Sequence, residues 1–96
     1  MANEEVIVRQ RDSGGSESFA FDVEVHGGGG RPTTHIVTVG RDYFAKFADA
    51  FVSPGELVEA SFQFLLSRES KHQILPEFDL PAIQRYFPDF EEAMLG

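Results

Sequence analysis

The residues of this chain whose types could support chemistry are three histidines and a run of glycines. His26 and His35 flank the stretch GGGGRP, and Glu24 lies two residues before His26. Two imidazoles and a carboxylate are a donor set that suits Zn²⁺, and a chain reversal at the glycines would bring the two histidines together. Their spacing matches no recognised zinc motif, so we expect solvent-facing histidines and no metal site. His72, beside Lys71 in a polar stretch, is also expected at the surface.

The glycine run also raises the question of a phosphate-binding loop. A P-loop needs Gly-x4-Gly-Lys-Ser/Thr at the start of a helix, and a dinucleotide loop needs Gly-x-Gly-x-x-Gly there. The stretch GGGGRPTT contains no lysine and leads into TTHIVTV, which is rich in β-branched residues. Arg31, Thr33 and Thr34 could hold an anion, but a flexible hairpin tip explains the composition better. The sequence therefore predicts no cofactor.

Catalysis by a nucleophile or by acid–base groups has little support. The chain has no cysteine and no Gly-x-Ser-x-Gly motif. Paired acids such as Glu91 and Glu92 are expected at a solvated end of the molecule. A general acid or base needs an environment that shifts its pKa. We therefore predict no catalytic residue, and a small enzyme ranks third among the functional hypotheses.

The composition limits the classes of function further. A chain of 96 residues, 42% hydrophobic and 25% charged, is predicted to form one domain over residues 1–96. The net charge of −8 is spread along the sequence and disfavours binding to nucleic acids or anionic membranes. No apolar run approaches the roughly 18 residues of a membrane span, and the start MANEEVIVRQR lacks signal-peptide features. Together with the absence of cysteine, this predicts a cytoplasmic protein.

Alternating apolar and polar residues predict the strands. In SFAFDVEVH, every second residue from Phe19 to Val25 is apolar, as in an antiparallel strand with one buried face. The glycine run and TTHIVTV follow, so these stretches are expected to form an antiparallel hairpin. Residues 1–16 are predicted to be flexible or to provide a short edge strand at Val6 to Val8.

Three helices are expected after the hairpin. The first is an amphipathic helix over Tyr43–Phe51. The second spans residues 54–68, begins at the capping residue Ser53 and is apolar around most of its circumference. The third is short, with Asp79 as its N-cap and Pro88 at its end. The predicted fold class is α+β, in which a hairpin of two or three antiparallel strands packs against three C-terminal helices.

The stretch FDLPAIQRYFPDF, residues 78–90, is dense in aromatic rings. Phe78, Ile83 and Phe87 are expected in the core, because the short helix needs one apolar face. Phe90 stands among acidic residues beyond that helix and is the best candidate for an exposed ring. The candidate partner-binding residues are Phe90, Glu91, Glu92 and Glu59.

Two motifs carry a resemblance to a known family. SPGELVEASFQFLLSRE, residues 53–69, followed by FDLPAIQRYFP, residues 78–88, is similar to a family of small uncharacterised bacterial proteins. The resemblance covers roughly residues 34–90. Gln63 and Ser70 depart from the pattern, which has a more acidic residue and a proline there. The resemblance implies one compact bacterial domain and assigns no catalytic or binding residue.

The preferred function is a small non-catalytic protein that binds or regulates another protein. The partner is expected to be a different protein, or a second copy that pairs along a strand edge. The alternative is a DNA-binding repressor of the ribbon-helix-helix kind, because a strand precedes two helices. In that case Thr34, Ile36 and Thr38 would read base edges. The net charge of −8 weighs against nucleic acid as the partner.

Overall fold

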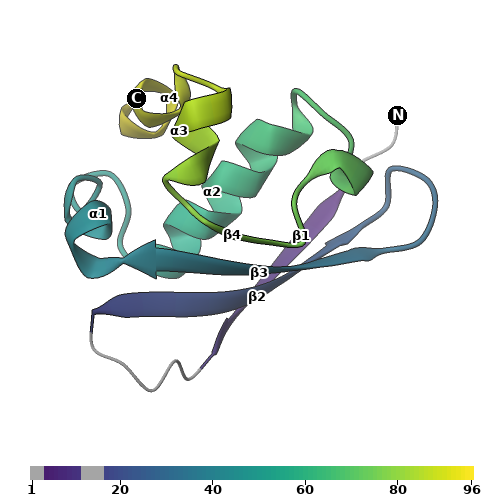
Figure 1. Ribbon diagram of the computed structural model, residues 1–96, viewed down its shortest axis with the longest axis horizontal. Coiled ribbons are helices and arrows are strands. Elements are labelled where there is room, and N and C mark those ends of the chain that lie inside the picture. The colour runs from purple at the N-terminus through teal and green to yellow at the C-terminus, as the bar shows by residue number, and fades with distance from the viewer. Residues whose placement is uncertain (1–3, 12–16) are drawn as a thin grey trace.

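A four-stranded sheet covered by helices on one face forms the framework of the protein (Figure 1). The computed structural model describes residues 4–11 and 17–96. The strands lie in the order β1, β2, β3, β4, and their bounds are Glu5–Arg11, Ser18–His26, Thr33–Gly40 and Glu77–Asp79. The first three strands are antiparallel, whereas β4 runs parallel to β3. The α+β class is confirmed, with a mixed sheet in place of a purely antiparallel one.

The N-terminal strand β1 is longer than the predicted Val6 to Val8. It spans seven residues and pairs along its length with β2, so that Val6 lies opposite Val25 and Val8 opposite Val23. The edge-strand option is therefore the one that the structure supports for this part of residues 1–16. The flexible option concerns residues 1–3 and 12–16, which lie outside the described part of the chain.

The turn between β2 and β3 depends on glycine. Gly27, Gly28, Gly29 and Gly30 all have φ between 71° and 90°, a region that other residues rarely adopt. A Cβ added at Gly28 would also lie 2.8 Å from the Glu4 carboxylate, so the Glu4 side chain would have to shift. The glycine run thus serves chain reversal.

Alternation gives the sheet one buried and one open face. The buried face carries Phe21, Val23 and Val25 of β2 and Val37 and Val39 of β3. The intervening side chains, such as Asp22 and Glu24, lie on the other face, which Figure 1 shows without helices. The core is completed from the helical side by Phe47, Leu57, Val58, Phe62, Leu65, Ile74, Leu80, Ile83 and Phe90.

The first two helices differ in how well they match the prediction. Helix α1 spans only Arg41–Ala45, and the chain continues in turns whose amides bond three residues back, such as Phe47 N to Phe44 O at 2.8 Å. The predicted helix over Tyr43–Phe51 is therefore wrong in extent. Helix α2 spans Pro54–Leu66, and the Ser53 hydroxyl accepts a hydrogen bond from the Glu56 amide at 3.3 Å, as the capping signal indicated.

The C-terminal part holds more elements than the single short helix expected. A 3₁₀ turn, η1, spans Lys71–Gln73 and is followed by β4, by α3 at Ala82–Tyr86 and by α4 at Phe90–Leu95. Asp79 belongs to β4 and not to a helix cap, because the next amide, Leu80 N, bonds to Thr38 O at 2.9 Å and extends the pairing with β3. The described part of the chain has four α-helices, whereas three were expected.

Candidate functional site

An apolar groove lies between the end of α2, the segment from η1 to β4, and α3. Its volume is about 340 Å³. Two of the residues that line it are polar, Glu69 and Gln73. The other lining residues are Leu65, Ile74, Leu75, Phe78, Ala82, Ile83, Tyr86 and Phe87. The groove is therefore a hydrophobic surface with a small polar part, which is the usual composition of a binding site.

Each wall of the groove follows from the element that carries it. On α3, Ile83 and Tyr86 are three residues apart and so share one side of the helix, and Phe87 follows as its C-cap. On β4, Phe78 lies opposite Val37, whose side chain is on the buried face of the sheet. The floor is well packed, with Leu65 4% and Ile83 3% exposed.

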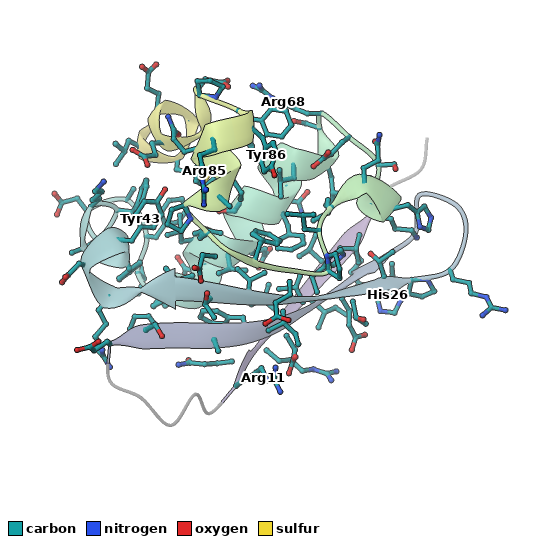
Figure 2. The ribbon with its side chains drawn as sticks, in the orientation of Figure 1. Arg11, His26, Tyr43, Arg68, Arg85 and Tyr86 are labelled. Atoms are coloured by element: carbon teal, nitrogen blue, oxygen red, sulfur yellow. The ribbon has the colours of Figure 1, made fainter. Side chains whose placement is uncertain are left out.

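The rim of the groove exposes large apolar side chains. Within residues 4–11 and 17–96 the exposed large hydrophobic residues are Val52, Leu75, Tyr86 and Leu95. Two of these, Leu75 and Tyr86, line the groove, and Tyr86 is 69% exposed. In Figure 2, Tyr86 lies to the right of α3 and Arg85 to its left. An exposed tyrosine at the mouth of an apolar depression is typical of a protein-binding surface.

Carboxylates give the groove its charge. Burial raises the pKa of Glu69, because its apolar surroundings disfavour the ionised form. On β4, Glu77 and Asp79 flank Phe78 and are exposed on the open face of the sheet. A cationic group in the groove would meet the carboxylate of Glu69, and one on the open side of β4 would meet those of Glu77 and Asp79, so this part of the surface is complementary to a partner that is both apolar and basic.

An ion pair fixes one wall of the groove. The guanidinium of Arg68 donates to both carboxylate oxygens of Asp89, at 3.0 and 2.5 Å, and this hydrogen bonding lowers the pKa of Asp89. The same guanidinium lies 4.4 Å from the ring centroid of Phe64 and 5.6 Å from that of Phe87. These contacts join the end of α2 to the residues after α3 and hold Phe87 in place.

The candidate partner-binding residues predicted from the sequence do not line this groove. Phe90 is fully buried, with its ring 5.4 Å from that of Phe64, so the prediction of an exposed ring is wrong. The physical reason is α4, which begins at Phe90 and turns its ring toward α2. A ring in this position cannot contact a partner.

The three acidic candidates lie at or near the surface. Glu91 is half-buried and accepts a hydrogen bond from the Tyr43 hydroxyl at 3.0 Å, and the pKa of Tyr43 is raised by burial and by this bond. Glu92 is exposed. Glu59 is also exposed and lines a smaller hollow of about 250 Å³ together with Phe51, Glu56, Ala60 and Gln63.

The histidines do not come together. His26 lies on the open face with its Nε2 2.9 Å from Glu24 Oε1, and this bond lowers the pKa of Glu24. His35 lies on the opposite, buried face and is 3% exposed, so the expectation that it faces solvent is wrong. Within the described residues, no group of three or more histidine, aspartate or glutamate side chains could hold a metal ion. His72 is exposed, as expected.

His35 holds the rim of the groove through a neutral ring. Its Nδ1 donates to Leu75 O at 2.8 Å, its Nε2 accepts from the Thr33 hydroxyl at 2.9 Å, and its ring lies 5.3 Å from that of Phe62. Burial lowers the pKa of His35 and so favours the uncharged imidazole, in which Nδ1 carries the proton and Nε2 accepts. The sequence did contain a signal for the burial of His35, because His35, Val37 and Val39 are alternate residues of β3 and so lie on the same face of the strand.

A pH dependence of stability follows from His35. Burial lowers its pKa below the usual 6.5, so the unfolded chain binds this proton more readily than the folded one. Neutral His35 makes its full contribution to the stability of the fold above pH 6.5. This contribution is lost as the pH falls from 6.5 toward the lower pKa of His35 in the folded chain. We expect His35→Gln to weaken the pH dependence of the free energy of unfolding, measured by denaturant, across that window. The control His72→Gln should leave that dependence as it is in the wild type. If the free energy of unfolding changes with pH equally in the two variants, His35 does not have this role.

The strand proposed for base reading has no free edge. β3 lies between β2 and β4, so its backbone is paired on both sides over Ile36–Thr38. A ribbon-helix-helix dimer needs this strand to pair with a second copy. Thr34, Ile36 and Thr38 lie on the open face of the sheet. The geometry gives the repressor hypothesis no support.

Comparisons of the chain with protein-family models, curated proteins and solved structures give no match. The resemblance of residues 34–90 to a bacterial family therefore stays a prediction. The described part of the chain contains no helix long and apolar enough to cross a membrane.

Proposed function

We propose that this chain is a small non-catalytic module, of bacterial and cytoplasmic type, that binds a protein partner through the groove between α2, β4 and α3. The observation that carries the proposal is the position of Leu75 and Tyr86, two exposed apolar side chains on the rim of one apolar depression. Burial of an exposed apolar surface is the main favourable term in protein association. While they remain exposed to water, these two side chains contribute no free energy of burial to the stability of the domain.

The partner segment is expected to be apolar with basic residues. Leu65, Ile83 and Phe87 offer contacts to apolar side chains, and Glu69 offers a carboxylate to a cation. A lysine or arginine beside Glu69 would favour its ionised form and so offset the effect of burial on its pKa. The net charge of −8 also favours encounter with a basic partner.

A selection from a displayed library of random short peptides tests the proposal. We expect the wild-type chain to enrich peptides with apolar and basic residues, and the variant Leu75→Ser/Tyr86→Ser to bind them roughly tenfold or more weakly. The matched control is Val52→Ser/Leu95→Ser, which removes the two other exposed apolar side chains outside the groove. Circular dichroism on each variant shows that it is folded.

Two outcomes would overturn the proposal. The first is that the control variant Val52→Ser/Leu95→Ser loses binding while Leu75→Ser/Tyr86→Ser keeps it. The second is that both double variants bind the selected peptides as well as the wild type does. A second copy as the partner would appear as a concentration-dependent mass in light scattering that Tyr86→Ser abolishes.

A further inference from the structure

The outer edge of β4 is open to another strand. β4 is the last strand of the sheet in the described residues, next to β3. Ile36 N donates to Pro76 O at 2.8 Å, and Leu80 N donates to Thr38 O at 2.9 Å. Since main-chain groups along a strand point alternately to its two sides, those of Glu77 and Asp79 point away from β3. These two residues present a donor and an acceptor each to whatever lies along the edge.

The open edge and the groove are adjacent. Phe78, which lines the groove, is the central residue of β4, and Figure 1 shows β4 beside β3 and below α3. A strand added along β4 would direct every second side chain to the groove side. The alternate side chains would lie on the open face of the sheet, beside the exposed carboxylates of Glu77 and Asp79.

We propose that the partner segment binds in an extended conformation, as a fifth strand along β4, and that its residues alternate between apolar and basic. This inference rests on the proposed function and states its mode of recognition. Main-chain hydrogen bonds to Glu77 and Asp79 supply affinity, the groove selects the apolar residues, and the two carboxylates select the basic ones. The occupant is an extended segment of a different protein.

The other edge of the sheet offers less to such a segment. The outer strand there is β1, on which Arg9 and Arg11 already pair with Glu24 and Asp22, at 3.9 and 3.4 Å. No residue of β1 lines the apolar groove.

Four synthetic peptides test the mode of binding with the full chain. The first alternates leucine and lysine, and the second has the same composition with leucine at helical spacing. The other two are the alternating peptide N-methylated at its odd or at its even positions, which removes the backbone donors along one edge at a time. We expect the alternating peptide to bind, the helical isomer to bind roughly tenfold or more weakly, and only one of the N-methylated peptides to lose binding.

Charge reversal on β4 is the second measurement. We expect Glu77→Lys/Asp79→Lys to weaken the alternating peptide roughly tenfold or more. The matched control is Glu59→Lys/Glu92→Lys, which changes the net charge equally at two exposed acids that line no part of the groove and should keep most of the binding. Equal losses in both pairs would mean that only the overall charge matters, and would overturn the assignment to β4.

The outcomes separate this inference from the proposed function. If both N-methylated peptides bind equally well, or if the helical isomer binds better, the fifth-strand mode is wrong. If Leu75→Ser/Tyr86→Ser weakens the binding of those peptides, the groove is still supported as a binding site. If the alternating peptide does not bind at all, the inference falls, and the library selection independently decides whether the groove binds any peptide.

Discussion

Replacement of Phe90 by alanine is expected to lower the free energy of unfolding by about 3–5 kcal/mol. The side chain is fully buried, and its ring packs edge-on against Phe64 at 5.4 Å. Alanine would leave a cavity between α4 and α2 that neighbouring side chains fill only in part. A small domain has a total stability of about 5–15 kcal/mol, so this single change would leave a sizeable unfolded fraction in the least favourable case.

Chemical denaturation of Phe90→Ala and Leu95→Ala makes the comparison. Both residues lie on α4, but Leu95 is 56% exposed, and its replacement should change stability by no more than about 0.5 kcal/mol. A loss for Phe90→Ala as small as that for Leu95→Ala would show that the ring is at the surface. That result would return Phe90 to the list of partner-binding residues.

Replacement of Lys71 by alanine is the second change with a large expected effect, about 2–4 kcal/mol. Lys71 is 2% exposed, and its Nζ donates to the carbonyl oxygen of Gly27 in the turn between β2 and β3. Alanine removes both the packed aliphatic stem and the donor, so the Gly27 carbonyl loses its partner. The turn should become more mobile, because this bond joins it to η1.

Lys71→Met separates the two contributions. Methionine keeps most of the stem and removes only the donor, so we expect a loss of about 1 kcal/mol. Amide hydrogen exchange at Gly28 to Gly30 should rise in both variants, whereas His72→Ala, at the exposed neighbour in η1, should leave it unchanged. If Lys71→Ala is as stable as the wild type, the contact with Gly27 does not hold the turn.

The strands and the central helix could be predicted because each has a pattern of its own. Alternation from Phe19 to Val25 fixes which side chains of β2 are buried, and Ser53 with Pro54 marks the start of α2. These signals lie within a few neighbouring residues. Packing in the folded chain only confirms them.

The short C-terminal elements could not be predicted in this way. β4 has three residues, too few to show a periodic pattern, and its strand character comes from pairing with Ile36–Thr38, 41 residues earlier in the chain. Similarly, Lys71 and Phe90 stand among polar or acidic neighbours, and only the turn η1 and the helix α4 direct them inward. Local composition indicated the surface for both residues, and tertiary packing overrode it.

The groove itself had no signal in the sequence. Ile83 is buried, as expected, but Phe78 and Phe87 are half-buried, because part of each ring lines the depression. The groove exists because α2, the η1–β4 segment and α3 meet around a space that their side chains do not fill. A property of this kind depends on how elements pack, and periodicity within each element cannot show it.

The most direct test of the groove as a binding site is a set of intermolecular methyl NOEs, measured on the isotope-labelled chain with a peptide from the library selection. We expect contacts from the apolar residues of the peptide to the methyl groups of Leu65, Leu75 and Ile83, which line the groove. Contacts to Ile7 and Ile36 without any to those three would place the peptide on the open face of the sheet and contradict the proposed site.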